Sequence, residues 1–228
     1  MATKASKTSS SASVVLDPSV RPAVSLPSGN AWAPAPPWNW TTVPAANGLG
    51  FQTTPFSADT TIVGPATLNL WVESSTPVLD VQATITEVRP ADTQEEYVTS
   101  GFLRTSNQVD LAASTPLFTV PSYLASDAAS LSPTTWHLVK VPIDPIAHTF
   151  RAGTELRVVL SAPGGDRPSW TFDSLDSGQS ATVGLGKVAP SSLVVQSVKN
   201  VTATPGNPTC GIVRGEPCRA YVAEGNQA

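Results

Sequence analysis

The sequence has 228 residues, and its 13 Lys plus Arg against 17 Asp plus Glu give a formal net charge of -4. This length fits one large β domain or two small domains with a sizeable core. The slightly acidic balance without a basic run argues against nucleic-acid and membrane partners, and no apolar stretch reaches the ~18 residues of a membrane-spanning helix.

The amino-acid composition favours an all-β fold. Most of the 22 Pro and 15 Gly fall between short runs rich in Val and Thr, which are strand-forming residues. Strong helix formers are scarce, so we expect many short strands joined by turns.

Residues 1–46 are expected to form a Ser/Pro/Trp-rich linker or N-terminal extension, because they show no sustained period. The apolar run 14–16 is cut off by Asp17-Pro18, so this region lacks the hydrophobic core of a signal peptide. The three indoles Trp32, Trp38 and Trp40 indicate that the linker lies along an apolar surface.

From residue 51 onward, apolar and polar residues alternate in short runs, as in a β-sandwich. The expected strands are 67–73, 81–90, 97–104, 136–141, 155–161, 169–172, 181–185 and 193–198. Gly101 inside the third run suggests a bulge or bend. No run predicts an amphipathic helix.

The segment 105–135 connects two of these strands and contains three prolines. Residues 123–129 allow one helical turn. Loops of this length are uncommon in compact domains and are more often functional or interface-forming than simple connections.

Serine hydrolase chemistry has no support in these residues. The nearest approach to a Gly-x-Ser-x-Gly elbow, around Ser180, lacks the second glycine and precedes a strand pattern. His137 and His148 are the two histidines of the chain, and neither has a nucleophile nearby in sequence. We expect both to be structural.

Metal and cofactor sites are not expected either. Asp166, Asp173 and Asp176 lie close together in a Gly-rich region, and carboxylates on loops can hold Ca²⁺. Their spacing is not that of an EF-hand, so solvated turn residues are favoured. No Gly-rich phosphate loop precedes a helix. On its own residues, the chain does not resemble an enzyme.

Cys210 and Cys218 lie in a turn-rich segment with a spacing that fits neither a redox nor a zinc motif. A local disulfide is favoured over two unpaired thiols. Such a bond would imply an oxidising compartment.

The order of several motifs resembles a known family. The runs 51–56, 62–65 and 68–75, followed by Asp80, 87–90, 101–104, 150–153 and 156–158, are similar to the C-terminal non-catalytic domain of X-Pro dipeptidyl-peptidase and cocaine-esterase-like serine hydrolases. The tail 210–221 looks like the end of secreted bacterial members.

This resemblance implies a jelly-roll β-sandwich of galactose-binding-like type in residues 47–228, ending in a disulfide-bearing tail. It implies an α/β-hydrolase domain as partner, carrying the catalytic triad. It also implies an extracellular location, with the export signal outside this chain. Whether the parent enzyme is a peptidase or an esterase stays open.

Asp80, Arg104 and Arg157 lie in strands or at strand ends, where an unpaired charge is costly. We expect structural ion pairs for all three. Where the family commonly has an acidic pair, this chain keeps only Asp80 and has Val78 at the first position.

Trp71 lies on the polar face of its strand, so it is not expected to belong to the core. Together with Leu70 it is expected at an interface with the hydrolase domain or around its substrate entrance. The alternative, which stays open, is that the linker or the long loop covers the indole. A further expectation is that the linker indoles, Trp71 and the segment 105–135 border one apolar patch.

The alternative function is a free-standing carbohydrate-binding or adhesive module, since jelly rolls serve this role and aromatic residues stack on sugars.

Overall fold

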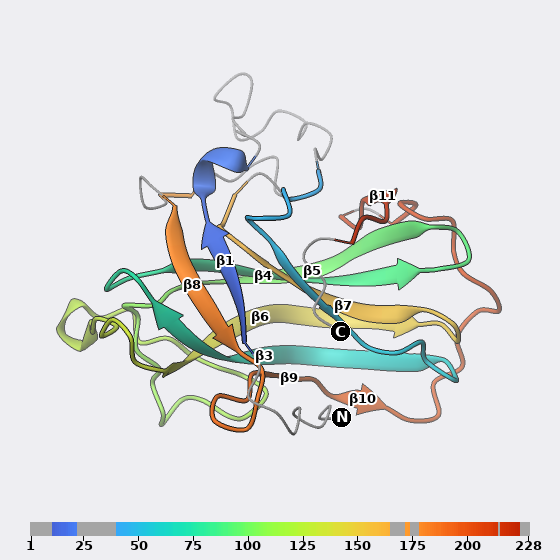
Figure 1. Cartoon of the computed structure of the whole chain (residues 1–228). Helices are drawn as coiled ribbons and strands as arrows, with labels where there is room; N and C mark the ends of the chain where they lie inside the picture. Colours follow the sequence, from blue (N-terminus) through green and yellow to red (C-terminus); the bar gives the residue numbers. More distant parts are fainter. Residues whose placement is uncertain (1–10, 22–39, 165–171, 174–177, 214, 224–228) are drawn as a thin grey trace, which may run out of the picture.

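The computed structural model describes residues 11–21, 40–164, 172–173, 178–213 and 215–223, which form two antiparallel sheets facing each other (Figure 1). Within these residues, sheet A contains β1 (Ser11–Leu16), β3 (Thr60–Ser74), β6 (His137–Phe150), β8 (Gln179–Gly184), β9 (Ser192–Val194) and β10 (Ser197–Val198). Sheet B contains β2 (Leu49–Gln52), β4 (Asp80–Arg89), β5 (Gln94–Arg104), β7 (Glu155–Ser161) and β11 (Cys218–Ala220).

Helical structure in the described part of the chain is limited to two 3-10 turns, η1 (Pro18–Val20) and η2 (Ala125–Asp127). The second lies where the sequence allowed a helical turn. No helix of the described residues is long and apolar enough to cross a membrane. The all-β prediction is therefore confirmed.

The first eight strands follow a jelly-roll path. Sheet A has the order β1-β8-β3, with β6 on the other edge of β3, and sheet B has the order β2-β7-β4-β5. Every connection among these strands crosses between the sheets, except the β4–β5 hairpin. This alternation is the winding of a jelly roll.

The expected N-terminal boundary at residue 47 is wrong, because β1 is the first strand of the jelly roll. Ala12, Val14 and Leu16 point into the core with 2–6% of their surface exposed. All six residues of β1 pair with β8, which lies more than 160 residues later in the chain. The short alternation was missed because only this distant partner turns it into a strand.

The core lies between the two sheets and is made by alternate side chains. Its centre includes Leu68, Leu70 and Val72 of β3 opposite Val81, Ala83 and Ile85 of β4, each at most 6% exposed. Burying each Leu, Val or Ile stabilises the fold by about 1.5–3 kcal/mol relative to exposing it. The period-two pattern therefore located the core correctly.

Strand β6 is longer than the sequence indicated because it tolerates prolines. The expected strand ended at residue 141, before Pro142 and Pro145, yet the pairing with β3 continues to Phe150. A register shift opposite Gly64 and Ala66 accommodates the extra residues. In sheet A β6 pairs with β3 and, among the described residues, has no second strand neighbour, so missing backbone donors are tolerated there.

Gly101 lies at a close contact between the sheets and not at a bulge. It pairs in register with Ala83, and the irregularity lies further along, where the register shifts between Ile85 and Thr86. A Cβ atom at position 101 would lie 1.8 Å from the carbonyl oxygen of Pro142. Glycine is therefore required by the approach of the β6 backbone.

The expected strand 169–172 falls mostly outside the described residues, and the expected strand 193–198 is divided into β9 and β10. Both short strands pair with β3 beyond the end of β8. Strand β3 is the longest of the described strands, and four other strands of sheet A pair with it: β6, β8, β9 and β10.

Candidate functional site

Trp71 and Leu70 lie on opposite faces of β3. Leu70 is 2% exposed and belongs to the core, so it offers no surface to a partner, and its expected place at an interface is corrected. Trp71 is half-buried on the outer face of sheet A, opposite Leu138 of β6. Its backbone N–H donates to Ser191 Oγ at 3.0 Å. Successive side chains of a strand point to opposite faces of the sheet, so Leu70 faces the core and Trp71 faces outward.

The long loop 105–135 is ordered by its own hydrogen bonds. Asp110 and Ser122 donate backbone N–H groups to Val120 and Gln108, and Ala129 donates to Ser106. The loop exposes four large apolar side chains: Leu111 (79%), Phe118 (50%), Tyr123 (69%) and Leu124 (61%). An ordered loop that keeps its apolar groups outside the core is unusual.

Two contacts anchor this loop to the sandwich. The buried hydroxyl groups of Thr119 and Thr67 are 3.0 Å apart, which ties the loop to the outer face of β3. Leu131 is 6% exposed and packs into the core. Phe118 directly precedes the first anchor and is half exposed.

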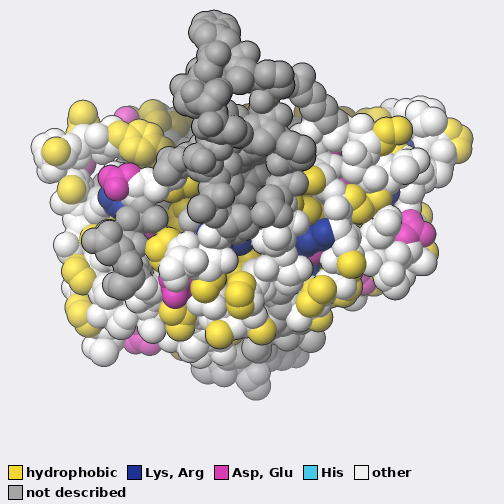
Figure 2. Space-filling model, turned by 90° about the horizontal axis from the view of Figure 1, so that it is seen from above, with side chains coloured by type: hydrophobic (Ala, Val, Ile, Leu, Met, Phe, Trp, Pro, Cys, Tyr) yellow, Lys and Arg dark blue, Asp and Glu magenta, His cyan; other side chains and the backbone are white. Residues whose placement is uncertain are grey.

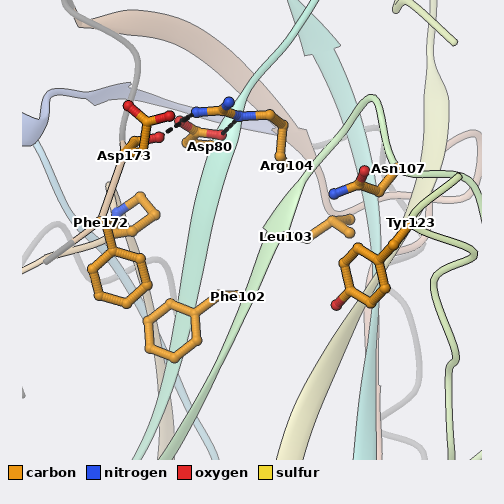
Figure 3. Close-up of a pocket in the computed structure, with 9 residues that line it drawn as sticks. Asp80, Phe102, Leu103, Arg104, Asn107, Tyr123, Phe172 and Asp173 are labelled. Atoms are coloured by element: carbon orange, nitrogen blue, oxygen red, sulfur yellow. Dashed lines mark hydrogen bonds and ion pairs between the residues drawn. The ribbon is translucent and has the colours of Figure 1, made fainter. Parts of the chain in front are cut away.

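A hollow of about 310 Å³ opens at the end of the sandwich where β4 begins and β5 ends (Figure 3). It is lined by Asp80, Phe102, Leu103, Arg104, Asn107, Tyr123, Pro163, Phe172 and Asp173. These residues come from β4, β5, the long loop and the segments after β7. The lining combines aromatic rings with polar groups, as ligand pockets do.

The structure brings Asp80 and Arg104 together at the edge of this hollow. Arg104 Nε and Nη2 donate to the two carboxylate oxygens of Asp80, both at 2.8 Å. Nη2 also donates to the Asp173 carbonyl oxygen at 2.6 Å. The hydrogen bonds to Asp80 raise the pKa of Arg104 above its ordinary value. This pairing joins the first residue of β4 to the last residue of β5.

Arg157 has a different partner, Glu95 of β5, at 3.1 Å, and both side chains are 0% exposed. Arg219 of β11 binds the other oxygen of Glu95 at 2.9 Å. The Arg219 guanidinium also stacks on Trp40, 4.0 Å from its ring centre. Two arginines around one carboxylate thus tie β11 and Trp40 to sheet B.

The expected patch uniting the linker indoles with Trp71 is not formed by the described residues. Trp40 packs edge-on against Tyr97 of sheet B, whereas Trp71 lies on sheet A. Trp32 and Trp38 lie outside the described residues. Stacking with Arg219 fixes Trp40 on its own sheet. Trp71 and Thr67, where the long loop is anchored, both lie on the outer face of β3.

A charge cluster closes the other end of the sandwich. Arg89 bonds to Glu96 and lies 3.2 Å from Glu87, and these three side chains are 1–2% exposed. His148 Nε2 lies 3.4 Å from Glu87, and its Nδ1 lies 3.9 Å from Glu216. The C-terminal tail also contacts this cluster, because the Pro208 carbonyl oxygen accepts a hydrogen bond from Arg89 and the Gly211 N–H donates one to Glu96.

The pKa values of the carboxyl groups in this cluster are shifted in opposite directions. Burial raises the pKa of Glu96 and of Glu216 above the usual glutamate range. Burial acts to raise the pKa of Glu87, but the nearby His148 and the hydrogen bond from Thr154 outweigh it, so the pKa of Glu87 is lowered. Apart from polar residues at the strand ends, no sequence pattern pointed to this cluster.

Both histidines have neighbours other than serine hydroxyl groups. The backbone N–H of Ser132 donates to His137 Nε2 at 2.9 Å, and His148 faces the charge cluster. Ser180 is exposed within β8, where its carbonyl oxygen accepts from Ser75. In the described part of the chain, no serine–histidine hydrogen bond forms a catalytic pair.

Among the described residues, no group of three or more His, Cys, Asp or Glu side chains is arranged to hold a metal ion. Asp173 lies at the hollow, and Asp166 and Asp176 lie outside the described residues. The charged side chains on the face shown in Figure 2 are few and scattered among hydrophobic and polar atoms, and in places a basic and an acidic group lie side by side.

Cys210 and Cys218 form the predicted disulfide, with their Cα atoms 5.5 Å apart. The bond lies beside β11 and close to Gly211, which has a φ of 76°. Glycine adopts this left-handed conformation without strain. The bond holds the tail in the hairpin that reaches the charge cluster.

Two antiparallel sheets in jelly-roll order define a β-sandwich domain. Over residues 2–193 the sequence matches the family described as the X-Pro dipeptidyl-peptidase C-terminal non-catalytic domain. The chain belongs to this family. The match begins well before residue 47, which agrees with β1 being part of the domain.

Two solved structures show the same fold. The chain has 19% identity and a TM-score of 0.62 to a CocE/NonD family hydrolase from Staphylococcus aureus, covering 85% of this chain and 34% of that one. It has 15% identity and a TM-score of 0.60 to an aminopeptidase from a marine sediment Thaumarchaeota archaeon, covering 86% and 34%. No curated protein matches the sequence. The chain spans about a third of the length of these solved structures.

Proposed function

We propose that this domain packs against an α/β-hydrolase domain and shapes the entrance to its active site. The family match supports this, because the family is named for the non-catalytic domain of a peptidase. In this proposal the partner domain supplies a serine nucleophile and hydrolyses a peptide or ester bond. The present chain supplies surface and support.

The observation that carries the proposal is the apolar surface of the loop 105–135. Single exposed apolar residues are common on proteins, but this loop places four of them on a backbone that is itself hydrogen-bonded. Leu138, 45% exposed, continues the apolar character next to Trp71 on sheet A. Grouped exposed apolar residues mark interaction surfaces.

We also propose an extracellular location for the whole protein. The disulfide between Cys210 and Cys218 supports it, since such bonds form and persist in oxidising compartments. Localising the tagged full-length protein in culture medium and cell fractions tests this point. Recovery in the reducing cytoplasm alone would contradict it.

The interface is tested by mixing this chain with the α/β-hydrolase domain encoded in the same or the neighbouring reading frame. We expect a complex by size-exclusion chromatography, and faster hydrolysis of an activated ester or an X-Pro anilide than by the hydrolase domain alone. Phe118→Ser and Leu124→Ser should each weaken the complex. Val201→Ser, which changes a 46% exposed valine beyond β10, is the matched control.

Failure of the two domains to associate, or equal weakening by all three variants, would contradict this interface. The chain alone should hydrolyse neither substrate above the buffer rate. Turnover that disappears with Ser180→Ala would show instead that the chain is an enzyme in its own right.

A further inference from the structure

The hollow at the end of the sandwich has walls of two kinds. Phe102 of β5 and Phe172 form a tilted aromatic pair with ring centres 4.7 Å apart. Across from them, Asn107 and Tyr123 of the long loop face the hollow (Figure 3). Segments far apart in sequence therefore converge on one cavity, which strand packing alone does not require.

Three polar groups of this hollow remain open to a ligand. Within the described part of the chain, the Asn107 side-chain amide and the Tyr123 hydroxyl have no hydrogen-bond partner. Arg104 directs Nε and Nη2 to Asp80 and Asp173, which leaves Nη1 as a donor. An amide, a phenol and a guanidinium N–H together offer both donors and acceptors.

The charged groups of the hollow restrict the ligand. Two carboxylates, Asp80 and Asp173, stand beside one guanidinium, Arg104. Arg104 is bonded to both carboxylate oxygens of Asp80, and the exposed Asp173 carboxylate would repel an anion. A wholly apolar ligand would remove water from three polar groups without replacing their hydrogen bonds, which is costly.

Tyr123 adds a second, independent observation. Its φ of 53° is left-handed, a conformation that costs a non-glycine residue on the order of 1–2 kcal/mol. The side chain is nevertheless 69% exposed, so burial of the ring does not offset the cost of this backbone conformation. Strained residues of this kind concentrate at functional sites.

We propose that this hollow binds a neutral sugar. A pyranose ring presents an apolar face that can stack on Phe102 or Phe172. Its hydroxyl groups both donate and accept, as Asn107, Tyr123 and Arg104 Nη1 require. About 310 Å³ lies at the lower limit of ligand pockets, so the site takes one or two sugar units. Tyr123 is shared with the exposed surface of the loop, but sugar binding does not require a hydrolase domain.

The test uses the isolated full-length chain labelled with ¹⁵N and titrated with glucose, galactose, mannose and cellobiose. We expect saturable shifts of the Asn107 side-chain amide and the Arg104 Nε–H signal with at least one sugar, at millimolar affinity. Phe172→Ala and Asn107→Ala should each weaken binding about tenfold, the equivalent of about 1.4 kcal/mol. Tyr123→Phe, which removes one exposed hydroxyl, should weaken it about threefold.

Val188→Ala, at a 71% exposed valine outside the hollow, is the control and should leave affinity unchanged. Phe172→Trp keeps an aromatic face and should restore binding, which separates stacking from folding. The absence of saturable shifts with all four sugars would overturn the proposal. So would binding that survives Phe172→Ala and Asn107→Ala together, or tighter binding of inorganic phosphate, tetramethylammonium or benzyl alcohol than of any sugar.

Discussion

The two ends of this sandwich differ in how deeply their charged and polar side chains are buried. At the closed end, beside the β4–β5 turn, Glu87, Arg89 and Glu96 are 1–2% exposed and are covered by the C-terminal tail. At the open end, Arg104 is 36% exposed, and Tyr123 stands in solvent.

The difference concerns how completely polar groups are paired. Charges of the closed end face opposite charges from neighbouring strands, because buried ions must be compensated. At the open end Arg104 is paired with Asp80, but the Asn107 amide and the Tyr123 hydroxyl are left to water. The closed end therefore serves stability, and the open end is the part of the surface available for binding.

The largest expected effect on the free energy of unfolding comes from a substitution in the core between the two ends. Val14→Asp places a carboxylate where 3% of the side chain is exposed, and should cost more than about 4 kcal/mol or prevent folding. Val15→Asp, at a 36% exposed neighbour, should cost less than about 1 kcal/mol. Urea unfolding followed by circular dichroism measures both. Equal effects would contradict the place of β1 in the sandwich.

At the closed end, Arg89→Met should reduce the free energy of unfolding by about 3–5 kcal/mol, because Glu87 and Glu96 stay buried without their cation. At the open end, Arg104→Met should cost less, about 1–2 kcal/mol, since Arg104 is itself 36% exposed and water can take its place beside Asp80. Both are measured by urea unfolding at neutral pH. A larger loss for Arg104→Met would reverse the comparison.

Removing the disulfide should loosen the closed end alone. The double variant Cys210→Ser/Cys218→Ser should lose about 2.5 kcal/mol from the entropy of the short loop that the bond closes. Hydrogen exchange should increase at β11 and the tail while the open end keeps its protection. Faster exchange at Asn107 to the same degree would contradict the independence of the two ends.

The pH dependence of the closed end should separate two of its glutamates. The pKa of Glu87 is lowered in the fold, so its stabilisation is present above the unfolded pKa of about 4.3 and is lost as pH falls through the folded value. Glu87→Gln should therefore destabilise the domain at pH ~7 and lose this effect at pH ~3.

Glu216 has the opposite sign, because burial raises its pKa. Its contribution is greatest below the unfolded pKa and is lost as pH rises through the folded value. Glu216→Gln should stabilise the domain by less than about 1 kcal/mol at neutral pH, since water screens this partly exposed group. Parallel pH profiles for the two variants would contradict this assignment.

The smallest effect on stability is expected on the long loop. Leu124→Ser changes a 61% exposed side chain and should alter the free energy of unfolding by no more than about 0.5 kcal/mol. Thermal unfolding of the isolated chain checks this value. A loss above about 2 kcal/mol would show that the loop is a structural element, unlike the binding surface proposed for the open end.

Local features of the sequence were sufficient for the fold class, part of the core and the disulfide. Leu68, Leu70 and Val72 alternate within one strand, and Cys210 and Cys218 are eight residues apart. The resemblance of short motifs also led to the family. These signals work because strand periodicity and short loop closure depend on neighbouring residues.

Tertiary structure alone decided which distant residues meet. Arg157 pairs with Glu95, 62 residues away, and β1 becomes a strand through β8. Gly101 is needed because another sheet approaches it, and the hollow forms where Phe102, Tyr123 and Phe172 converge. A single sequence contains the side chains of each such contact but not their pairing, because the pairing of strands far apart in the chain is set by the collapse of the whole sandwich.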